Sequence, residues 1–436
     1  AEVPPSSAAG GHGATAGAMG RAPRAGLLLL LTGCASRVSG NGPVANFTGG
    51  SIPLLGFGCG SPFEETYREA LKAGYRHFDT AFSHYNHRVV GKVIRESDVP
   101  RQEIFLTTKV GGVLSSQHCC FGLVPLPKPM TDPDVGDPGA GAGTYARGRE
   151  LEGVKHALQE LGLDYIDLCL IHRPAVTALE MQALYLPHYQ MMGVIQPWQR
   201  DYLQRLLNAA VRLENLGSGR AAAAAKRAES WRQMEEAKRL GLCKHIGVSN
   251  FPEGALREME TYAREMPQVV QMENTLKCRH PSVLQYARDK KMAVTGYGTG
   301  MSKGVGYLQL MGIAQRLGRT PNQVLLRWRL QHNVGLLQGS LKPERMRENL
   351  AVLDFELSPG DMAELDRLNE DSPGYFDLSW FDSRDAGLLQ VLAVLAEPLL
   401  IGAIVGLAGC CLCCCCLRLC RSRATGSAAH EAKKDA

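Results

Sequence analysis

A chain of 436 residues is long enough to bury one large core, and a single β/α barrel of about 250 residues with insertions fits within it. The formal net charge of +5 is small and no run of lysine and arginine with interleaved aromatics occurs, so we expect no nucleic-acid partner. Seven of the 14 cysteines lie between Cys410 and Cys420, and the others are scattered without the paired spacing of a zinc site, so we expect no metal and a reduced main domain.

The first 45 residues are rich in alanine, glycine, serine and proline, which predicts a disordered leader or a segment that is removed. Within this segment a short basic stretch precedes the leucines Leu27–Leu31, a pattern typical of a short signal sequence. Two short apolar runs follow between Phe47 and Gly60, on either side of Gly49-Gly50. This arrangement predicts a β-hairpin.

Strand-like and helix-like patterns alternate after the hairpin. A helix is expected to begin at Ser61, which precedes Pro62 at the first helical position. Eight short β-rich runs predict strands at Leu54–Gly58, Tyr75–Thr80, Ile104–Val110, Ile166–His172, His245–Asn250, Val269–Glu273, Ala293–Tyr297 and Val334–Ser340. Because such alternation gives a parallel sheet and eight units favour closure, we predict an α/β fold. Its main domain, residues 46–381, is a (β/α)8 TIM barrel with an amino-terminal β-hairpin.

Two stretches are longer than ordinary barrel loops. Residues 111–146 contain several prolines, Cys119-Cys120 and a glycine-alanine repeat, and we expect a long mobile loop above the active face. Residues 175–225 contain an amphipathic piece around Leu203–Leu213, which predicts a helix added to the barrel.

Three of the predicted strands carry an ionisable residue at or near the carboxyl end. Asp79, Lys109 and His172 are these residues. The loops of a β/α barrel converge on the carboxyl ends of its strands, and chemistry takes place there. We therefore expect the three side chains to meet at one mouth of the barrel.

The sequence around these residues resembles the aldo-keto reductase family. The shared motifs, in chain order, are Asp79-Thr80-Ala81 with Asn86 and Gly91, Thr108-Lys109, Leu170-Ile171-His172, Gly247-Val248-Ser249-Asn250-Phe251, Tyr297, Pro343-Glu344-Arg345 and Glu348-Asn349-Leu350. They extend over most of the chain, from Phe47 to Asp371. The resemblance implies an NADP(H)-dependent oxidoreductase that reduces a small-molecule aldehyde or ketone to an alcohol by hydride transfer.

The resemblance gives Asp79, Lys109 and His172 the roles of the family's catalytic aspartate, lysine and histidine. Hydride transfer to a carbonyl leaves charge on oxygen, so the site needs an acid beside that oxygen. The family's acid is a tyrosine five residues after the aspartate, but His84 stands there and Tyr85 follows it. We slightly favour Tyr85 as the proton donor, with neutral His84 as the alternative. A third interpretation is a barrel that binds cofactor and turns over poorly.

By the same resemblance, Ser249, Asn250 and Gln271 hydrogen-bond the nicotinamide amide, and Tyr297 stacks on its ring. A second group is matched to the adenosine half of the cofactor: Ser340 and Arg345 for a 2′-phosphate, Glu348 and Asn349 for adenine. Gly339 stands where the family usually has a lysine, which removes one cation. NADP, as NADPH, is the favoured cofactor, and NAD is the alternative.

The predicted substrate pocket has lost aromatic residues. Gly60 stands where the family often has tryptophan, and Val110-Gly111-Gly112 follows Lys109 without an aromatic residue. Arg173, directly after His172, occupies another commonly aromatic position. These departures predict a wider or differently lined pocket.

Residues 399–417 form an unbroken apolar run that is followed by Arg418, Arg421 and Arg423. As a helix, this run spans roughly 28 Å and crosses the hydrocarbon core of a bilayer. We predict a single transmembrane helix within a hydrophobic anchor at residues 388–417, and a basic tail at residues 418–436. The positive-inside bias places the tail in the cytosol, whereas a cytosolic cofactor supply favours the reverse, so the side of the membrane stays open.

Two functions are consistent with these features. The first is a membrane-anchored aldo-keto reductase that uses NADP(H). The alternative is a cofactor-binding, weakly catalytic or inactive sensor or regulatory subunit at a membrane, which the departure at His84 would allow.

Overall fold

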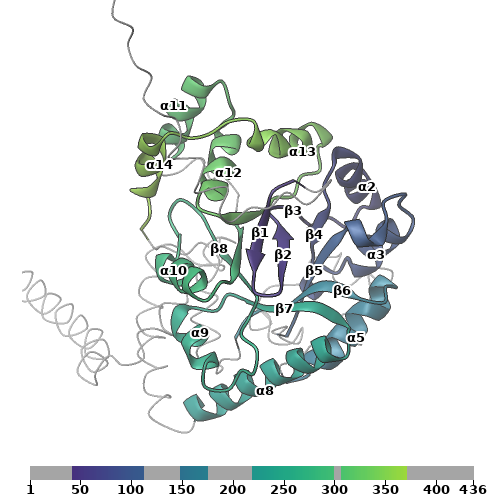
Figure 1. The fold of residues 1–436 in the computed structure, drawn as a ribbon. Coiled ribbons are helices and arrows are strands. Elements are labelled where there is room, and N and C mark those ends of the chain that lie inside the picture. Colours follow the sequence, from purple (N-terminus) through teal and green to yellow (C-terminus); the bar gives the residue numbers. More distant parts are fainter. Residues whose placement is uncertain (1–41, 112–147, 175–218, 299–305, 371–436) are drawn as a thin grey trace, which may run out of the picture.

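The computed structural model describes residues 42–111, 148–174, 219–298 and 306–370, and within them eight parallel strands close into a barrel (Figure 1). The strands are β3 (Leu55–Gly58), β4 (His77–Asp79), β5 (Phe105–Val110), β6 (Ile166–Ile171), β7 (Cys243–Ser249), β8 (Val269–Glu273), β9 (Ala293–Tyr297) and β10 (Val334–Leu337). Each pairs in parallel with its neighbours in the chain, and β10 pairs with β3 to close the ring. The predicted (β/α)8 barrel is therefore confirmed, and each predicted strand overlaps an observed one.

Helices lie on the outside of the strand ring (Figure 1). They are α2 (Glu64–Ala73), α3 (His87–Arg95), α5 (Glu150–Leu161), α8 (Gly219–Arg239), α9 (Glu253–Met259), α10 (Pro281–Asp289), α11 (Tyr307–Leu317), α12 (Pro321–Gln331), α13 (Pro343–Leu350) and α14 (Pro359–Asp366). The start of α2 was predicted two residues too early. Its N-cap is Phe63, whose backbone N–H donates to the Ser61 hydroxyl at 3.1 Å. The predicted loop at 175–225 is also too long, because α8 begins at Gly219.

The hairpin β1 (Val44–Phe47) and β2 (Gly50–Pro53) lies across the amino end of the barrel, at the centre of the view in Figure 1. Phe47 packs edge-on against the His245 ring with centroids 4.9 Å apart. The backbone N–H of Thr48 donates to the Lys291 carbonyl at 3.2 Å. The hairpin prediction is confirmed, but β1 begins at Val44, so the last residues of the segment predicted as a leader (1–45) belong to the first strand.

The apolar core has two main layers. The larger layer lies between the strands and the surrounding helices and includes Phe57, Phe78, Ile246 and Trp231. A second cluster fills the barrel interior and the underside of the hairpin, with these members among others: Ala45, Ile52, Leu168, Leu170, Val269 and Leu336. Alternate residues of β6 point into different layers, so this strand is buried along its whole length.

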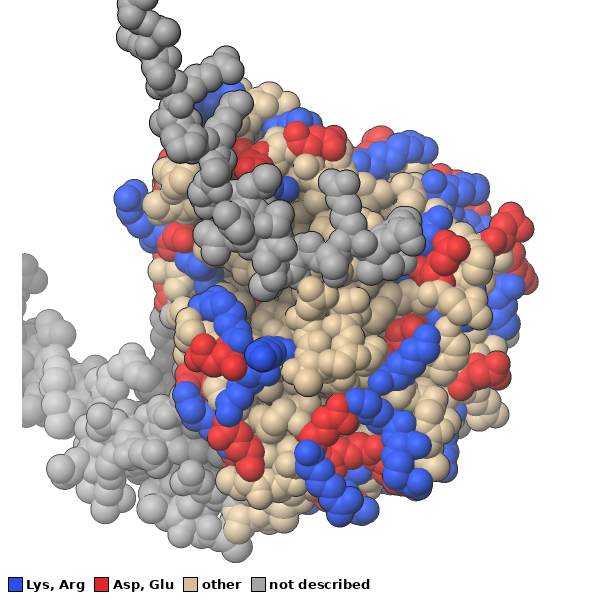
Figure 2. Space-filling model, viewed as in Figure 1, with Lys and Arg blue, Asp and Glu red and all other residues tan. Residues whose placement is uncertain are grey.

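A charged cluster sits near the amino ends of β5, β6 and β7. The Asp167 carboxylate pairs with Arg101 at 2.7 Å and with Lys244 at 3.1 Å. The same two cations lie over the Tyr165 ring, 4.2 Å and 3.8 Å from its centroid. On the outer surface of this end, lysine and arginine are interspersed with aspartate and glutamate (Figure 2).

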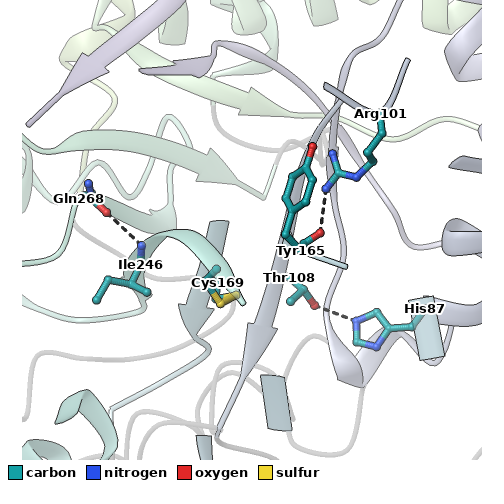
Figure 3. The surroundings of a disulfide bond; sticks show 8 residues. His87, Arg101, Thr108, Tyr165, Cys169, Ile246 and Gln268 are labelled. Atoms are coloured by element: carbon teal, nitrogen blue, oxygen red, sulfur yellow. Dashed lines mark hydrogen bonds between the residues drawn. A yellow bond between two sulfur atoms is a disulfide. The ribbon is translucent and has the colours of Figure 1, made fainter. Parts of the chain in front are cut away.

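The prediction of a reduced main domain is wrong for one pair of cysteines. Cys169 of β6 and Cys243 of β7 form a disulfide, with Cα atoms 5.9 Å apart. Both are buried in the layer between strands and helices, and Figure 3 shows Cys169 between Ile246 and Thr108. The two lie 74 residues apart in the chain. Only the parallel pairing of β6 with β7 brings them within disulfide range.

Several predicted segments lie outside the described residues. They are residues 1–41, residues 112–146, the helix expected around Leu203–Leu213, and the anchor and tail at residues 388–436. Within the described ranges, none of the helices combines the length and apolarity that crossing a bilayer needs.

Candidate active site

A cavity of about 280 Å³ opens at the carboxyl ends of the barrel strands. Its described lining residues are Gly58, Asp79, Ser83, His84, Lys109, His172, Arg173, Ser249, Asn250, Gln271, Tyr297 and Leu337. They come from all eight strands of the barrel, or from the residues directly after them, and from the turn after β4. The structure thus gathers the predicted aspartate, lysine and histidine in one place, together with the residues matched to the nicotinamide.

A buried ion pair forms the floor of this cavity. Lys109 Nζ donates to Asp79 Oδ1 and, at 3.0 Å, to the Thr80 carbonyl. The other carboxylate oxygen of Asp79 accepts from Gln271 Nε2 at 2.8 Å. Asp79 and Lys109 are each only 4% exposed. Hydrogen bonds from Lys109 and Gln271 fix the carboxylate of Asp79, which in turn holds Lys109 Nζ in a fixed position.

The turn after β4 decides which side chain faces the ion pair. It forms a short 3-10 helix, η1 (Phe82–His84), and Tyr85 ends it in the left-handed region with φ 52°. His84 lines the cavity, whereas Tyr85 packs on the core outside the barrel with its ring 5.7 Å from that of Phe82. Of the two candidate proton donors, the structure thus places His84 and not Tyr85 on the described lining of the cavity. The side chains of adjacent residues point in different directions, and the backbone of this turn does not direct the Tyr85 hydroxyl into the cavity.

Asn86 holds this turn in place. Its side-chain amide donates to the Cys59 carbonyl at 2.8 Å and to the Tyr67 hydroxyl at 2.9 Å. Its carbonyl oxygen accepts from Thr80 Oγ1 at 2.6 Å. These buried bonds join β3, β4 and α2 to the residue that follows Tyr85. They fix the direction of the chain, and with it the positions of His84 and Tyr85.

Both histidines of the cavity are held neutral at physiological pH. The pKa of His84 is lowered to about 4, first by desolvation of the imidazole and then because Lys109 disfavours a second positive charge, although the residue is partly accessible to solvent. His84 is still open to the cavity and can touch a ligand there. Burial also lowers the pKa of His172 well below its usual value, and Arg173 and Lys109 lower it further.

Polar side chains from β7, β8 and β9 form one wall of the cavity. Asn250 has a left-handed backbone with φ 60°, and its amide donates to the His172 carbonyl at 3.0 Å and to Ser249 Oγ at 3.2 Å. The Tyr297 hydroxyl donates to Asn250 Oδ1. Gln271 reaches the floor instead, through its bond to Asp79. The four residues predicted to contact the nicotinamide thus line one cavity, and the link from Gln271 to Asp79 is an addition that the sequence did not reveal.

The residues matched to the adenosine half of the cofactor lie outside this cavity, around α13. The Ser340 hydroxyl accepts from the Lys342 backbone N–H at 3.1 Å, and Arg345 is exposed. The other two residues of this set, Glu348 and Asn349, form hydrogen bonds toward α12. A carboxylate oxygen of Glu348 accepts from the Thr320 hydroxyl, and Asn349 Oδ1 accepts from Asn322 Nδ2 at 2.7 Å. None of these four residues is among the described lining residues of the cavity.

Gly339 has a steric reason for lacking a side chain. A Cβ at this position would lie 2.5 Å from the carbonyl oxygen of Gly58 on β3. Real Cβ atoms do not approach backbone oxygen so closely, and the two strands cannot easily move apart in a closed barrel. A lysine at this position would thus disturb the junction of β10 with β3.

Four lining residues were not assigned to the site by the sequence. Gly58, Ser83 and Leu337 gave no signal, because nothing in their types or spacing points to chemistry. Arg173 was noticed only as a missing aromatic residue. Its place directly after His172, at the end of β6, was the available signal, because every residue at that end of a barrel strand borders the mouth.

A closed barrel with a lysine–aspartate pair, two neutral histidines and an amide-rich wall at its carboxyl end defines a (β/α)8-barrel enzyme that carries acid–base groups at its mouth. The comparison with protein families gives a more specific result. Residues 62–305 and 307–370 match the model of the Aldo/keto reductase family. The chain belongs to the aldo-keto reductase family, whose members are NAD(P)H-dependent carbonyl reductases.

Individual relatives agree with this assignment. An aldo-keto reductase of Mycolicibacterium paratuberculosis is 30% identical over 327 residues, which cover 73% of this chain and 86% of the relative. The NAD(P)H-dependent D-xylose reductase of Candida tropicalis is 26% identical over 349 residues, covering 74% and 90% of the two chains. Among solved structures, a Bombyx mori aldo-keto reductase in complex with NADP has a TM-score of 0.55 at 22% identity, covering 79% of this chain and 97% of that one. This last likeness concerns the fold alone.

Proposed function

We propose that this protein reduces an aldehyde or ketone to an alcohol, with NADPH as the hydride donor and His84 in the position of the acid. One observation carries the proposal: Asp79, Lys109, His84 and His172 converge in a single cavity whose adjoining wall is made of Ser249, Asn250, Gln271 and Tyr297.

The cavity has the donors and acceptors that a nicotinamide carboxamide needs. The polar residues Ser249, Asn250 and Gln271 line it, together with the aromatic residue Tyr297. Lys342 and Arg345 are exposed cations near the start of α13, and among the described residues neither side chain has an acidic partner. They suit a 2′-phosphate, which favours NADP over NAD. A relative described as NAD(P)H-dependent is consistent with a nicotinamide cofactor of either kind.

When bound, the dihydronicotinamide supplies the hydride, and the protein stabilises the charge that develops on the carbonyl oxygen. His172 and His84 border the space where that oxygen would lie. A neutral imidazole donates one hydrogen bond from its N–H, which orients and polarises the carbonyl. Lys109, fixed by Asp79 and by the Thr80 carbonyl, adds positive charge below them. Full proton transfer needs imidazolium at His84, so we expect slow turnover at neutral pH.

The test is NADPH consumption by the full chain with simple aldehydes, followed by loss of NADPH absorbance. His84→Gln should lower kcat roughly 100-fold, because the cavity loses its acid. Tyr85→Phe is the matched control, and it should leave kcat within a factor of two of wild type (about 0.4 kcal/mol), because the phenol packs outside the cavity. A large loss with Tyr85→Phe and none with His84→Gln would refute the assignment of the acid.

A second candidate function is a cofactor-bound barrel that acts as a sensor or regulatory subunit. The observation that favours it is again His84, because an imidazole held neutral is a weak proton donor. Tight NADPH binding to the full chain without turnover of any aldehyde tested, from pH 5 to pH 8, would favour this function over reduction.

The proposal includes a location. The apolar run at residues 399–417, followed by three arginines, supports a single membrane anchor near the carboxyl end, on a side that the sequence leaves open. Fractionation of cells that express the full chain tests this. The protein should stay with membranes after alkaline extraction, and a variant that lacks residues 388–436 should be released. Equal release of both forms would refute the anchor.

A further inference from the structure

We infer that Asn46 carries an N-linked glycan and that the barrel therefore lies on the non-cytosolic side of a membrane. Asn46-Phe47-Thr48 has the Asn-x-Thr pattern of an N-glycosylation acceptor, with a residue other than proline in the middle. A tripeptide this short also arises by chance, so it needs support from the structure. The support comes from the position of Asn46, from the disulfide and from the charges around the apolar run at residues 399–417.

Asn46 lies on the outer face of the hairpin. It is the third residue of β1, where it is exposed between the buried residues Ala45 and Phe47. Side chains alternate along a strand, so Asn46 points away from the face on which Ala45 and Phe47 are packed. Its partner across the hairpin is Ser51, which is partly exposed. A bulky, hydrated oligosaccharide attached to Asn46 would thus extend into solvent without disturbing the core.

The hairpin is also remote from the cavity (Figure 1). Phe47 packs on His245, near the start of β7. The Thr48 carbonyl accepts from Gln268 Nε2 at 3.0 Å, and the Thr48 N–H donates to the Lys291 carbonyl at 3.2 Å. Gln268 and Lys291 come just before β8 and β9, so the hairpin contacts the amino ends of these strands. The cavity is at their carboxyl ends, and a glycan on Asn46 leaves it open.

The disulfide indicates the redox environment in which the barrel folds. Cys169 and Cys243 are 0% and 1% exposed, so neither sulfur is accessible to a thiol in solution. Disulfides in the cytosol are mostly transient bonds with a catalytic or sensing role, and such bonds need access. A bond buried between strands and helices is structural, and structural disulfides persist in oxidising compartments. The lumen of the endoplasmic reticulum is such a compartment, and N-linked glycans are attached there.

The charges around the apolar run at residues 399–417 favour the same side. Arg418, Arg421 and Arg423 follow the run, whereas Arg384 is the one lysine or arginine among the fifteen residues before it. Basic residues next to a membrane span are retained in the cytosol, so this asymmetry places the tail in the cytosol and the barrel on the opposite side. The acceptor tripeptide and the disulfide add two independent reasons for that orientation.

The transfer is a substitution at carbon. The side-chain nitrogen of Asn46 forms a bond to the anomeric carbon of an oligosaccharide that is carried on a lipid diphosphate. The bond from that carbon to the diphosphate oxygen breaks, the lipid diphosphate leaves with the electron pair, and the amide nitrogen loses one proton. Neither an oxidant nor a reductant takes part. The reaction modifies the chain as it enters the compartment, before the hairpin forms, so the contacts of Asn46 in the folded barrel do not affect the transfer.

The experiment uses the full protein, expressed from its own start codon in cultured eukaryotic cells. A glycosidase that removes N-linked glycans should increase the gel mobility of wild type by one step, because the sequence has one acceptor tripeptide. Asn46→Gln removes the acceptor, and Thr48→Ala removes the hydroxyl of the tripeptide. Both variants should migrate like the treated wild type and should not respond to the glycosidase. Thr48→Ser preserves the tripeptide, and Ser51→Ala is the control on the facing strand, so both should keep the shift.

The side of the membrane has a second readout. Sealed vesicles with their cytosolic face outward are treated with an amine reagent that does not cross membranes, and the labelled lysines are mapped. Lys433 and Lys434 of the tail should be labelled. Lys72 of α2, whose side chain is 65% exposed, should be labelled only after detergent opens the vesicles. Labelling of Lys72 in sealed vesicles would overturn the inference, and so would a wild type whose mobility does not respond to the glycosidase.

These outcomes are independent of the proposed reduction and of the proposed anchor. A protein that reduces no aldehyde still reports its glycan by mobility. A glycosylated protein that is released by alkaline extraction would refute the anchor while this inference stands. If the glycan is present and aldehydes are reduced, NADPH has to be supplied on the side of the membrane where the barrel lies.

Discussion

The barrel has a buried carboxylate–cation cluster at each end. At the amino end Asp167 pairs with Arg101 and Lys244, and at the carboxyl end Asp79 pairs with Lys109. Both carboxylates are almost fully buried. The two carboxylates differ in their surroundings. Asp167 accepts from the backbone N–H of Leu106 and is not among the described lining residues of the cavity, whereas Asp79 lines it.

The histidines of the two ends show the same contrast. His77, near the hairpin, is hydrogen-bonded at both ring nitrogens, to the Pro53 carbonyl at 3.1 Å and to Thr107 Oγ1 at 3.0 Å. His84 and His172 instead face the cavity. Burial lowers the pKa of all three, so a shifted pKa alone does not separate a structural histidine from a functional one. What distinguishes His84 and His172 from His77 is that they line the cavity.

The largest expected effect comes from removing one charge at each end. Lys109→Met should lower kcat roughly 100- to 1,000-fold, because the developing oxyanion loses a fixed positive charge. Asp167→Asn should leave kcat close to wild type but lower the free energy of unfolding by about 1–3 kcal/mol, because Arg101 and the Leu106 N–H lose a charged acceptor. Steady-state kinetics and urea unfolding of both variants measure these effects. A comparable loss of kcat with Asp167→Asn would remove the distinction between the two ends.

Removing the disulfide tests whether activity at the carboxyl end of the barrel depends on the covalent link between β6 and β7. Cys169 and Cys243 join β6, which leads to His172, with β7, which ends at Ser249. Replacing both cysteines with serine should lower the free energy of unfolding by about 2–4 kcal/mol. We expect little change in kcat/KM, because Asn250 independently links the two strand ends. Thiol titration of the unfolded, unreduced wild type should find two fewer reactive cysteines than after reduction. Equal counts would show that the bond does not form.

The fold was largely predictable from the sequence, because barrel strands and helices leave periodic signals that act over short distances. The eight strands and the hairpin follow from such patterns, and Asp79, Lys109 and His172 follow from their places at strand ends. Which of His84 and Tyr85 lines the cavity did not follow from the sequence. It depends on the left-handed backbone of Tyr85 and on buried hydrogen bonds from Asn86 to Cys59 and Tyr67. The disulfide and the Gln271–Asp79 bond also join residues far apart in the chain, and their geometry exists only after the barrel has closed.

His84 should give the reaction its pH dependence. Its pKa is lowered to about 4, so the imidazolium that can transfer a proton becomes about tenfold rarer with each pH unit above that value. The kcat/KM for reduction should therefore rise about tenfold per unit as the pH falls from 7 to 5. His84→Tyr, which restores the family's phenol, should flatten this profile and raise the rate at pH 7. A wild-type profile that is flat over this range would show that His84 does not donate the proton.

The smallest expected effect concerns His77, at the amino end. Its pKa is lowered by burial, so the unfolded chain binds a proton below about pH 6.5 that the folded chain does not bind. Stability from this group is present above that pH and is lost as the pH falls, by about 1.4 kcal/mol per pH unit. Urea unfolding of wild type and His77→Gln between pH 5 and pH 7 measures this as a difference in slope. The variant should lose less stability on acidification while its pH profile of kcat/KM stays that of wild type. A changed kcat/KM profile would mean that the amino end takes part in the chemistry of the carboxyl end.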